Sequence, residues 1–166
     1  MNDETEKKIA YAFAVESRAA IRTETYALKA VQEGYPELAS LFRAIADAKS
    51  VHAQRFLRLM RGKVGTTEEN LETALQNEIR AIEHEYPSMI HHVAREGSKA
   101  LKESFDHAMH TDGEYADLYG NAMKNMLKKE PVEYYVCQIC GHVEKTGIPE
   151  RCPVCNAVST RFKKVI

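Results

Sequence analysis

Four cysteines, all within the last thirty residues of the chain, have the spacing of metal ligands. They form two Cys-x-x-Cys pairs, Cys137 with Cys140 and Cys152 with Cys155. A two-residue spacer in a tight turn directs both sulfurs toward one centre, and two such pairs complete a tetrahedral site of four thiolates. Four thiolates suit iron or zinc. We therefore predict a tetrathiolate metal site near the C-terminus.

Two disulfides are the alternative use of four cysteines. The rest of the chain carries no cysteine, and its first residues lack the basic and then apolar pattern of a secretory signal. Because structural disulfides belong to oxidising compartments, this pattern favours a metal and a cytoplasmic location. Gly141 and Asn156 follow the second cysteine of each pair, where the backbone often needs a positive φ that both residues tolerate.

The chain upstream of the cysteines reads as helix. From residue 3 to about residue 129 it is rich in Ala, Leu, Glu and Lys, with apolar residues three or four positions apart. Breaks are expected at 34–36, at 61–67 and at Gly97, and Pro131 marks the end of the last helix. Four long helices joined by short turns are typical of a four-helix bundle.

The pattern changes after Pro131. Residues 132–136, Val-Glu-Tyr-Tyr-Val, predict a short strand that leads into the first cysteine pair. We therefore expect two domains, a helical bundle over 1–131 and a small metal-binding domain over 132–166, and we expect the second to need its metal in order to fold.

Each predicted helix carries at least one ionisable or polar side chain on its apolar face. These groups are Glu16 in the first helix, Lys49 and His52 in the second, Glu78 in the third, and Asp112 and Tyr115 in the fourth. Burying charged groups is unfavourable unless they pair with one another or bind a cation. The middle of the bundle is therefore a second candidate site.

These features together resemble the rubrerythrins, in which a ferritin-like four-helix bundle with a diiron site precedes a rubredoxin-like iron domain. The resemblance covers essentially the whole chain. It rests on the double cysteine pair, with eleven residues between Cys140 and Cys152, and on segments in each helix, which are Ala14-Val-Glu-Ser17, Ile45 to His52, Glu78 with Tyr86-Pro87, and Ala116-Asp-Leu-Tyr119. The implied fold is mainly α, a ferritin-like bundle followed by a rubredoxin-like domain.

The resemblance also implies a ligand set for the bundle, and this chain departs from it. Glu16, His52, Glu78 and Asp112 match family ligands and would be the catalytic and metal-binding residues. Three other expected ligands are replaced: Lys49 stands where a glutamate precedes His52 by three residues, Ala81 replaces an extra glutamate of the third helix, and Tyr115 replaces a histidine of the fourth. Two divalent irons bring four positive charges. The three carboxylates and the one lysine together carry a net charge of −2, which balances one divalent cation. We expect one further iron or other divalent metal in the bundle, or an ion-pair network around Lys49.

By resemblance, the function is that of a non-haem iron oxidoreductase, an NADH-linked peroxidase that reduces hydrogen peroxide. An unidentified electron-donor protein would supply electrons through the tetrathiolate iron, and the family implies a homodimer. Two alternatives stay open. One is a non-catalytic electron-transfer or redox-sensing protein in which only the four cysteines bind metal, and the other is a zinc-ribbon interaction module on a helical scaffold.

Other side chains and the overall charge bear on further kinds of metal site and on possible partners. His107, His110 and Glu114 lie on adjacent turns and leave a displaced metal site open, whereas His84-Glu85 lacks the second histidine of a zincin because residue 88 is serine. With 23 basic and 24 acidic residues, the chain has no basic surface that would favour nucleic acid. It has no apolar run long enough for a membrane span.

Overall fold

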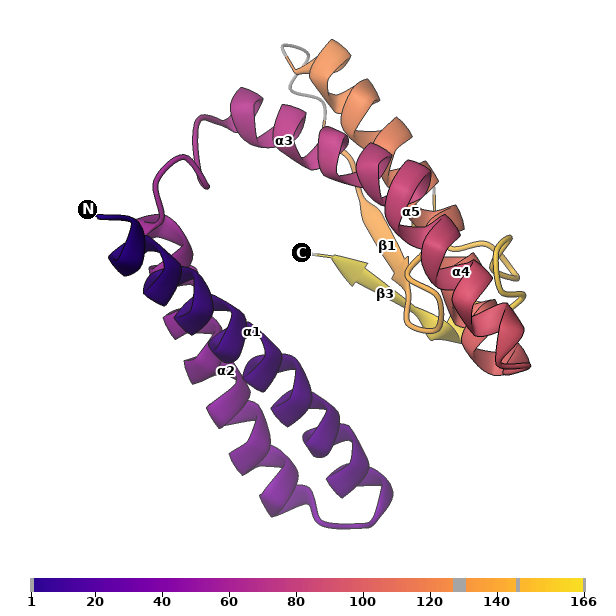
Figure 1. Ribbon diagram of the computed structural model, residues 1–166. Coiled ribbons are helices and arrows are strands. Elements are labelled where there is room, and N and C mark those ends of the chain that lie inside the picture. The colour runs from indigo at the N-terminus through magenta and orange to yellow at the C-terminus, as the bar shows by residue number, and fades with distance from the viewer. Residues whose placement is uncertain (1, 127–130, 146, 166) are drawn as a thin grey trace. The chain divides into compact units, whose positions relative to one another are not determined.

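The chain is mainly helical and ends in a small sheet (Figure 1). The structure is a computed structural model that describes residues 2–126, 131–145 and 147–165. It divides into two compact units, residues 1–65 and residues 66–166. The fold class is the predicted one, and none of the described helices is both long and apolar enough to cross a membrane.

The first unit is a hairpin of two long helices, α1 (Asp3–Gln32) and α2 (Pro36–Leu59). The Asn2 side chain caps α1 by accepting from the Thr5 N–H at 2.9 Å. Gly34, with φ of 83°, makes the turn that the sequence predicted. Only small residues are buried in this hairpin, which lets the two helices approach closely. They are Ala20, Ala27, Ala30, Ala39, Ala46 and Ala53.

The second unit begins with a helix that changes its winding. Helix α3 (Thr67–Arg80) starts at the predicted capping box, in which Thr66 and Glu69 satisfy each other's backbone N–H groups. It continues as a π-helical turn, η1 (Ala81–Glu85), and then as α4 (Tyr86–Arg95). Proline lacks a backbone N–H, so the π turn is where the helix accommodates Pro87. These three elements form the third of the four predicted helical segments.

The fourth helical segment is α5 (Lys99–Asn125), which packs against α3, η1 and α4. The sheet that follows has three antiparallel strands in the order β2-β1-β3. The strands are β1 (Tyr134–Cys137), β2 (Val143–Glu144) and β3 (Phe162–Val165), with a 3-10 turn, η2 (Ser159–Arg161), before β3. Cys137 pairs with Phe162 across β1 and β3, and both are buried.

The predicted helix breaks agree with the structure, since α1, α2, α4 and α5 end or begin within a few residues of each. The predicted domain boundary near residue 131 stays a prediction, because residues 127–130 lie outside the described residues and α5 is described only up to its cap. The predicted strand of 132–136 is present as β1, shifted by one or two residues toward the first cysteine.

Candidate metal centre

The four cysteines come together at one point of the second unit. All four sulfurs lie within 4.8 Å of one another, with 3.7 Å between Cys137 Sγ and Cys155 Sγ and 3.6 Å between Cys140 Sγ and Cys152 Sγ. A tetrahedral ion with metal–sulfur bonds of about 2.3 Å needs sulfurs about 3.8 Å apart. The spacing of the thiols is therefore close to what such an ion needs, and among the described residues this is the only cluster of its kind.

The two cysteine loops prepare these sulfurs as ligands. Gly141 and Asn156 have φ of 87° and 60°, the left-handed values that the sequence predicted. Backbone N–H groups donate to the sulfurs, from His142 to Cys140 and from Ala157 to Cys155. Such donors stabilise thiolates.

Burial and these donors act against each other on the thiol pKa values. Burial raises the pKa of Cys140 and of Cys155. At Cys137 burial acts in the same sense, yet the N–H groups of Cys140 and Ile139 outweigh it and lower the pKa to about 7. Metal binding would therefore displace protons from Cys140 and Cys155, whereas Cys137 loses its proton more readily.

The hairpin brings three of the predicted bundle residues together. Lys49 Nζ lies 3.0 Å from one carboxylate oxygen of Glu16, and His52 Nδ1 lies 3.2 Å from the other. The Glu16 side chain is 17% exposed, Lys49 35% and His52 58%. The bond from Lys49 is the main reason that the pKa of Glu16 lies below its ordinary value, and His52 lowers it further. Both oxygens of this carboxylate are thus already occupied.

The second unit brings the other two predicted carboxylates together. Burial raises the pKa of Glu78, and the charge of Asp112 and a hydrogen bond with it raise it further. A hydrogen bond between two carboxyl groups requires a proton on one of them, and the raised pKa of Glu78 favours its protonated form. Tyr86 joins the pair: burial, and then its hydrogen bond to Asp112, raise the pKa of Tyr86 to about 12. Tyr86 had not been assigned a role from its sequence position.

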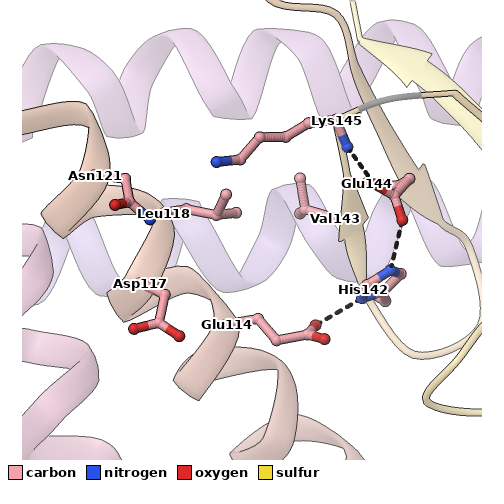
Figure 2. A pocket seen from close by; sticks show the side chains of 8 residues that line it. All are labelled: Glu114, Asp117, Leu118, Asn121, His142, Val143, Glu144 and Lys145. Carbon is pink, nitrogen blue, oxygen red and sulfur yellow. Dashed lines mark hydrogen bonds and ion pairs between the residues drawn. The ribbon is translucent and has the colours of Figure 1, made fainter. Parts of the chain in front are cut away.

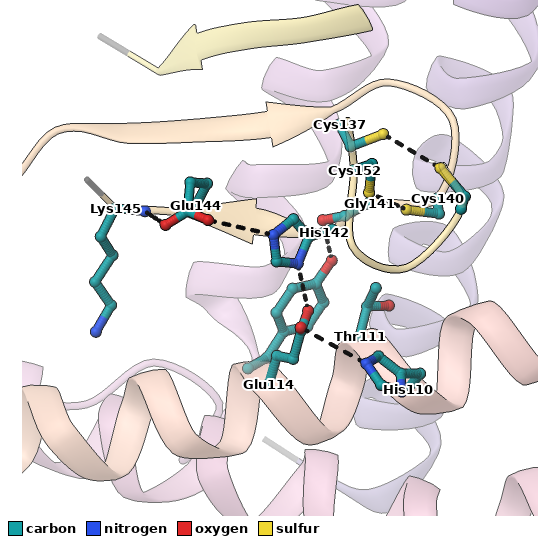
Figure 3. A network of polar contacts seen from close by, with 12 residues as sticks. His110, Thr111, Glu114, Cys137, Cys140, Gly141, His142, Glu144, Lys145 and Cys152 are labelled. Carbon is teal, nitrogen blue, oxygen red and sulfur yellow. Dashed lines mark hydrogen bonds and ion pairs between the residues drawn. The ribbon is translucent and has the colours of Figure 1, made fainter. Parts of the chain in front are cut away.

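Tyr115, which was expected beside Asp112 in the bundle site, is bonded elsewhere. Its hydroxyl donates to the carbonyl of Gly141 at 2.6 Å, so α5 touches the first cysteine loop (Figure 3). Next to it, Glu114 Oε2 lies 2.6 Å from His142 Nδ1, and His142 is only 6% exposed. His142 also went unnoticed in the sequence, although its place directly after the Cys-x-x-Cys-Gly turn could have drawn attention to it.

The remaining histidine candidates do not form a metal cluster among the described residues. His110 Nε2 lies 3.7 Å from Glu114, whose other oxygen bonds His142. Figure 2 shows the pocket that Glu114 and His142 line together with Asp117. His91 and His92 are exposed on α4.

Comparisons with known proteins agree with this arrangement. A family model described as Rubrerythrin matches residues 7–123, and a second, described as the rubredoxin-like domain of rubrerythrin, matches residues 135–163. The chain belongs to the rubrerythrin family. Rubrerythrin-2 of Clostridium acetobutylicum is 24% identical over 92% of this chain and 91% of its own length. Rubrerythrin of Porphyromonas gingivalis is 28% identical over 96% of this chain and 88% of its own length.

A solved structure supports the fold. Nigerythrin in a partially reduced state superposes with a TM-score of 0.59 over 97% of this chain and 86% of that one, at 24% sequence identity. The family and fold predicted from the sequence are thereby confirmed. The four cysteines lie within the rubredoxin-like domain, and their donor set suits iron or zinc.

The Glu78–Asp112 pair gives this rubrerythrin-family chain a pH-dependent stability. Because the pKa of Glu78 is raised in the folded protein, the unfolded chain binds fewer protons above the ordinary value of 4.5. Stability is therefore expected to fall as the pH rises through the raised pKa. Glu78→Gln should remove this decline, measured as urea unfolding between pH 5 and pH 8 at one metal per chain. Glu68→Gln, at an exposed position in the first turn of α3, is the control, and an unchanged slope in Glu78→Gln would contradict the raised pKa of Glu78.

Proposed function

We propose that this chain is a non-haem iron redox protein of the peroxide-reducing type, with an iron at the four cysteines as its electron carrier and at most one divalent cation in the bundle. The limit of one bundle cation rests on the contact between Lys49 and Glu16, because an ammonium already occupies a carboxylate that matches a family ligand. Family membership and the geometry of the four sulfurs support the proposal of a redox iron at the four cysteines.

The charge available in each cluster supports a low metal content. In the hairpin, Lys49 neutralises Glu16, and His52 can add only a neutral imidazole ligand. In the second unit, the raised pKa of Glu78 favours its neutral form, which reduces the negative charge available beside Asp112. Two divalent irons bring four positive charges, and stable diiron sites place several carboxylates around them. The charge that remains here suits one cation at most.

Peroxide reduction would use the protons that these side chains hold. Reducing one hydrogen peroxide to two waters consumes two electrons and two protons. An iron bound by four thiolates supplies one electron at a time, so an external donor protein, and ultimately NADH, would have to reload it. The Glu78 proton and the Tyr86 hydroxyl lie together at Asp112, where they could donate to a departing oxygen. Hydrogen peroxide is therefore the proposed substrate.

Electron transfer or redox sensing without peroxide chemistry is the second candidate. It is favoured by the same Lys49–Glu16 pair and by Tyr115, whose hydroxyl is bonded to the cysteine loop. In this case the helices are a scaffold and only Cys137, Cys140, Cys152 and Cys155 bind a working metal. A zinc-ribbon interaction module is the third possibility, and it differs from the other two in having no redox-active ion.

Metal content separates these functions. We expect elemental analysis of untagged protein, prepared without oxygen, to give between one and two irons per chain and the visible spectrum of a ferric tetrathiolate. Turnover of hydrogen peroxide with an artificial donor would then favour the enzyme, and its absence would favour electron transfer. Zinc alone would support the interaction module. About three irons per chain would contradict the proposed limit of one bundle cation.

We also propose a cytoplasmic homodimer. The hairpin buries only alanines and leaves large apolar side chains exposed, among them Tyr11 at 69%, Ile21 at 72% and Val51 at 62%. A second copy of the chain is the partner that the family implies, and covering these side chains would stabilise it. A sedimentation mass equal to one chain at micromolar concentration would contradict this assembly.

A further inference from the structure

The contact between Tyr115 and the first cysteine loop reaches one of the metal-binding sulfurs through a single peptide group. Tyr115 donates to the carbonyl oxygen of Gly141 at 2.6 Å. That carbonyl and the N–H of His142 belong to the same peptide unit, and this N–H donates to Cys140 Sγ. The phenol of Tyr115 on α5 and the sulfur of Cys140 are thus joined by two hydrogen bonds in series.

Gly141 is suited to this arrangement in two ways. Its φ of 87° is one that residues with a side chain rarely adopt. In addition, a Cβ at this position would lie 2.8 Å from the Tyr115 hydroxyl, closer than real Cβ contacts allow. Absence of a side chain therefore permits both the turn of the loop and the close approach of the phenol.

The peptide is also fixed from its other side. The His142 ring is 94% buried, given its 6% exposure, and it stands edge-on to Phe162 in the core of the sheet. Glu114, the residue before Tyr115 on α5, holds His142 Nδ1 at 2.6 Å. Thr111, one turn earlier on α5, hydrogen-bonds the Tyr115 phenol as well. Glu114 and Tyr115, which are consecutive on α5, therefore orient His142 and Gly141, which are consecutive in the cysteine loop.

We propose that Tyr115 is a positioning residue for the metal centre, which strengthens the His142 N–H to Cys140 Sγ hydrogen bond by polarising the Gly141–His142 peptide. Hydrogen bonds in a chain polarise one another by about 10–30% per bond. Reduction of a ferric tetrathiolate adds one negative charge to the sulfur cage, so a stronger donor to sulfur favours the reduced state. The effect on iron rests on the proposed function, in which iron occupies the four cysteines.

The test is the reduction potential of the iron centre in full-length Tyr115→Phe, measured by a spectroscopic redox titration. Removing the hydroxyl should lower the potential, shifting the equilibrium about threefold toward the oxidised state, or about 28 mV, since tenfold is 59 mV for one electron. Tyr119→Phe, one turn further along α5, is the matched control and should leave the potential unchanged. Among the described residues no hydrogen bond links Tyr119 to the cysteine loops.

Two results would overturn the proposal. An unchanged potential in Tyr115→Phe would mean that the phenol does not act on the sulfur. A raised potential would mean that loosening the loop and admitting water to the sulfurs dominates, since water stabilises the more highly charged reduced state.

A second readout does not depend on iron. In protein loaded with zinc, the amide proton of His142 should move upfield in the NMR spectrum of Tyr115→Phe, because its bond to sulfur weakens, and should stay in place in Tyr119→Phe. An unmoved proton would overturn the proposal. Failure of the wild-type protein to bind iron would instead defeat the proposed function and leave this zinc measurement intact.

Discussion

Replacing Cys152 with serine is expected to unfold the sheet region, residues 134–165, while leaving the helices in place. The buried hydrophobic residues described in this region are only Cys137, Cys152 and Phe162, so we expect its stability to come mainly from the metal. Structural zinc contributes about 10–16 kcal/mol in comparable small peptides, which exceeds what so small a core supplies. Metal content should fall by one ion per chain, and hydrogen exchange should become fast in β1 and β3 with the helical circular dichroism retained.

Val154→Ala is the matched control for this loss. Val154 lies between Cys152 and Cys155 and packs against the same small core, but it offers no ligand atom. It should lower the stability of the region modestly while keeping a full complement of metal. If Cys152→Ser kept both its metal and its slow exchange, the four sulfurs would not be the ligand set that their geometry indicates.

The second large effect is expected at Lys49. Lys49→Glu removes the ammonium that lies 3.0 Å from Glu16 and places a carboxylate three residues before His52, which is the Glu-x-x-His arrangement of diiron bundles. We expect affinity for a bundle cation to rise at least tenfold, measured by ferrous or cobalt titration of protein whose four-cysteine site is already filled.

The same substitution should destabilise the metal-free hairpin, because it sets two carboxylates side by side. Lys8→Glu changes the net charge by the same amount at an exposed position of α1, where it replaces a surface ion pair with Glu4, and it should leave metal uptake unchanged. Lys49→Gln removes the positive charge without adding a carboxylate, so it separates the effect of losing the charge from the effect of gaining a ligand. If Lys49→Glu bound no more metal than Lys8→Glu, Lys49 would not occupy a ligand position.

Local features of the fold were predictable because short-range chemistry determines them. The turn at Gly34, the capping box at Thr66 and Glu69, and the left-handed residues Gly141 and Asn156 each depend on a few neighbouring atoms. The four-cysteine site was predictable for the same reason, since two-residue spacing within a turn brings sulfurs together whatever the rest of the chain does.

The partners of Tyr115 and Tyr86 could not be predicted in this way. A helical pattern gives the face on which Tyr115 lies, but its acceptor, the Gly141 carbonyl, is a backbone atom of a loop 26 residues further along the chain. Every residue has a backbone carbonyl, so the sequence does not indicate which one accepts from Tyr115. The position of Tyr86 beside Asp112 depends on the π turn at Ala81–Glu85, whose effect on side-chain direction the sequence does not show.

That π turn determines which side chains of the third helical segment meet Asp112. In an α-helix, Glu78 and Tyr86 are eight residues apart and would point about 80° away from each other, at about 100° per residue. A π turn absorbs about one extra residue, so the two are separated as if by seven positions, and the angle shrinks to about 20°. Both contact Asp112. The segment Ala81–Glu85 therefore behaves as a one-residue insertion: deleting one of its residues should restore a plain α-helix and preserve the alignment, whereas the same deletion in α3 should turn Glu78 away.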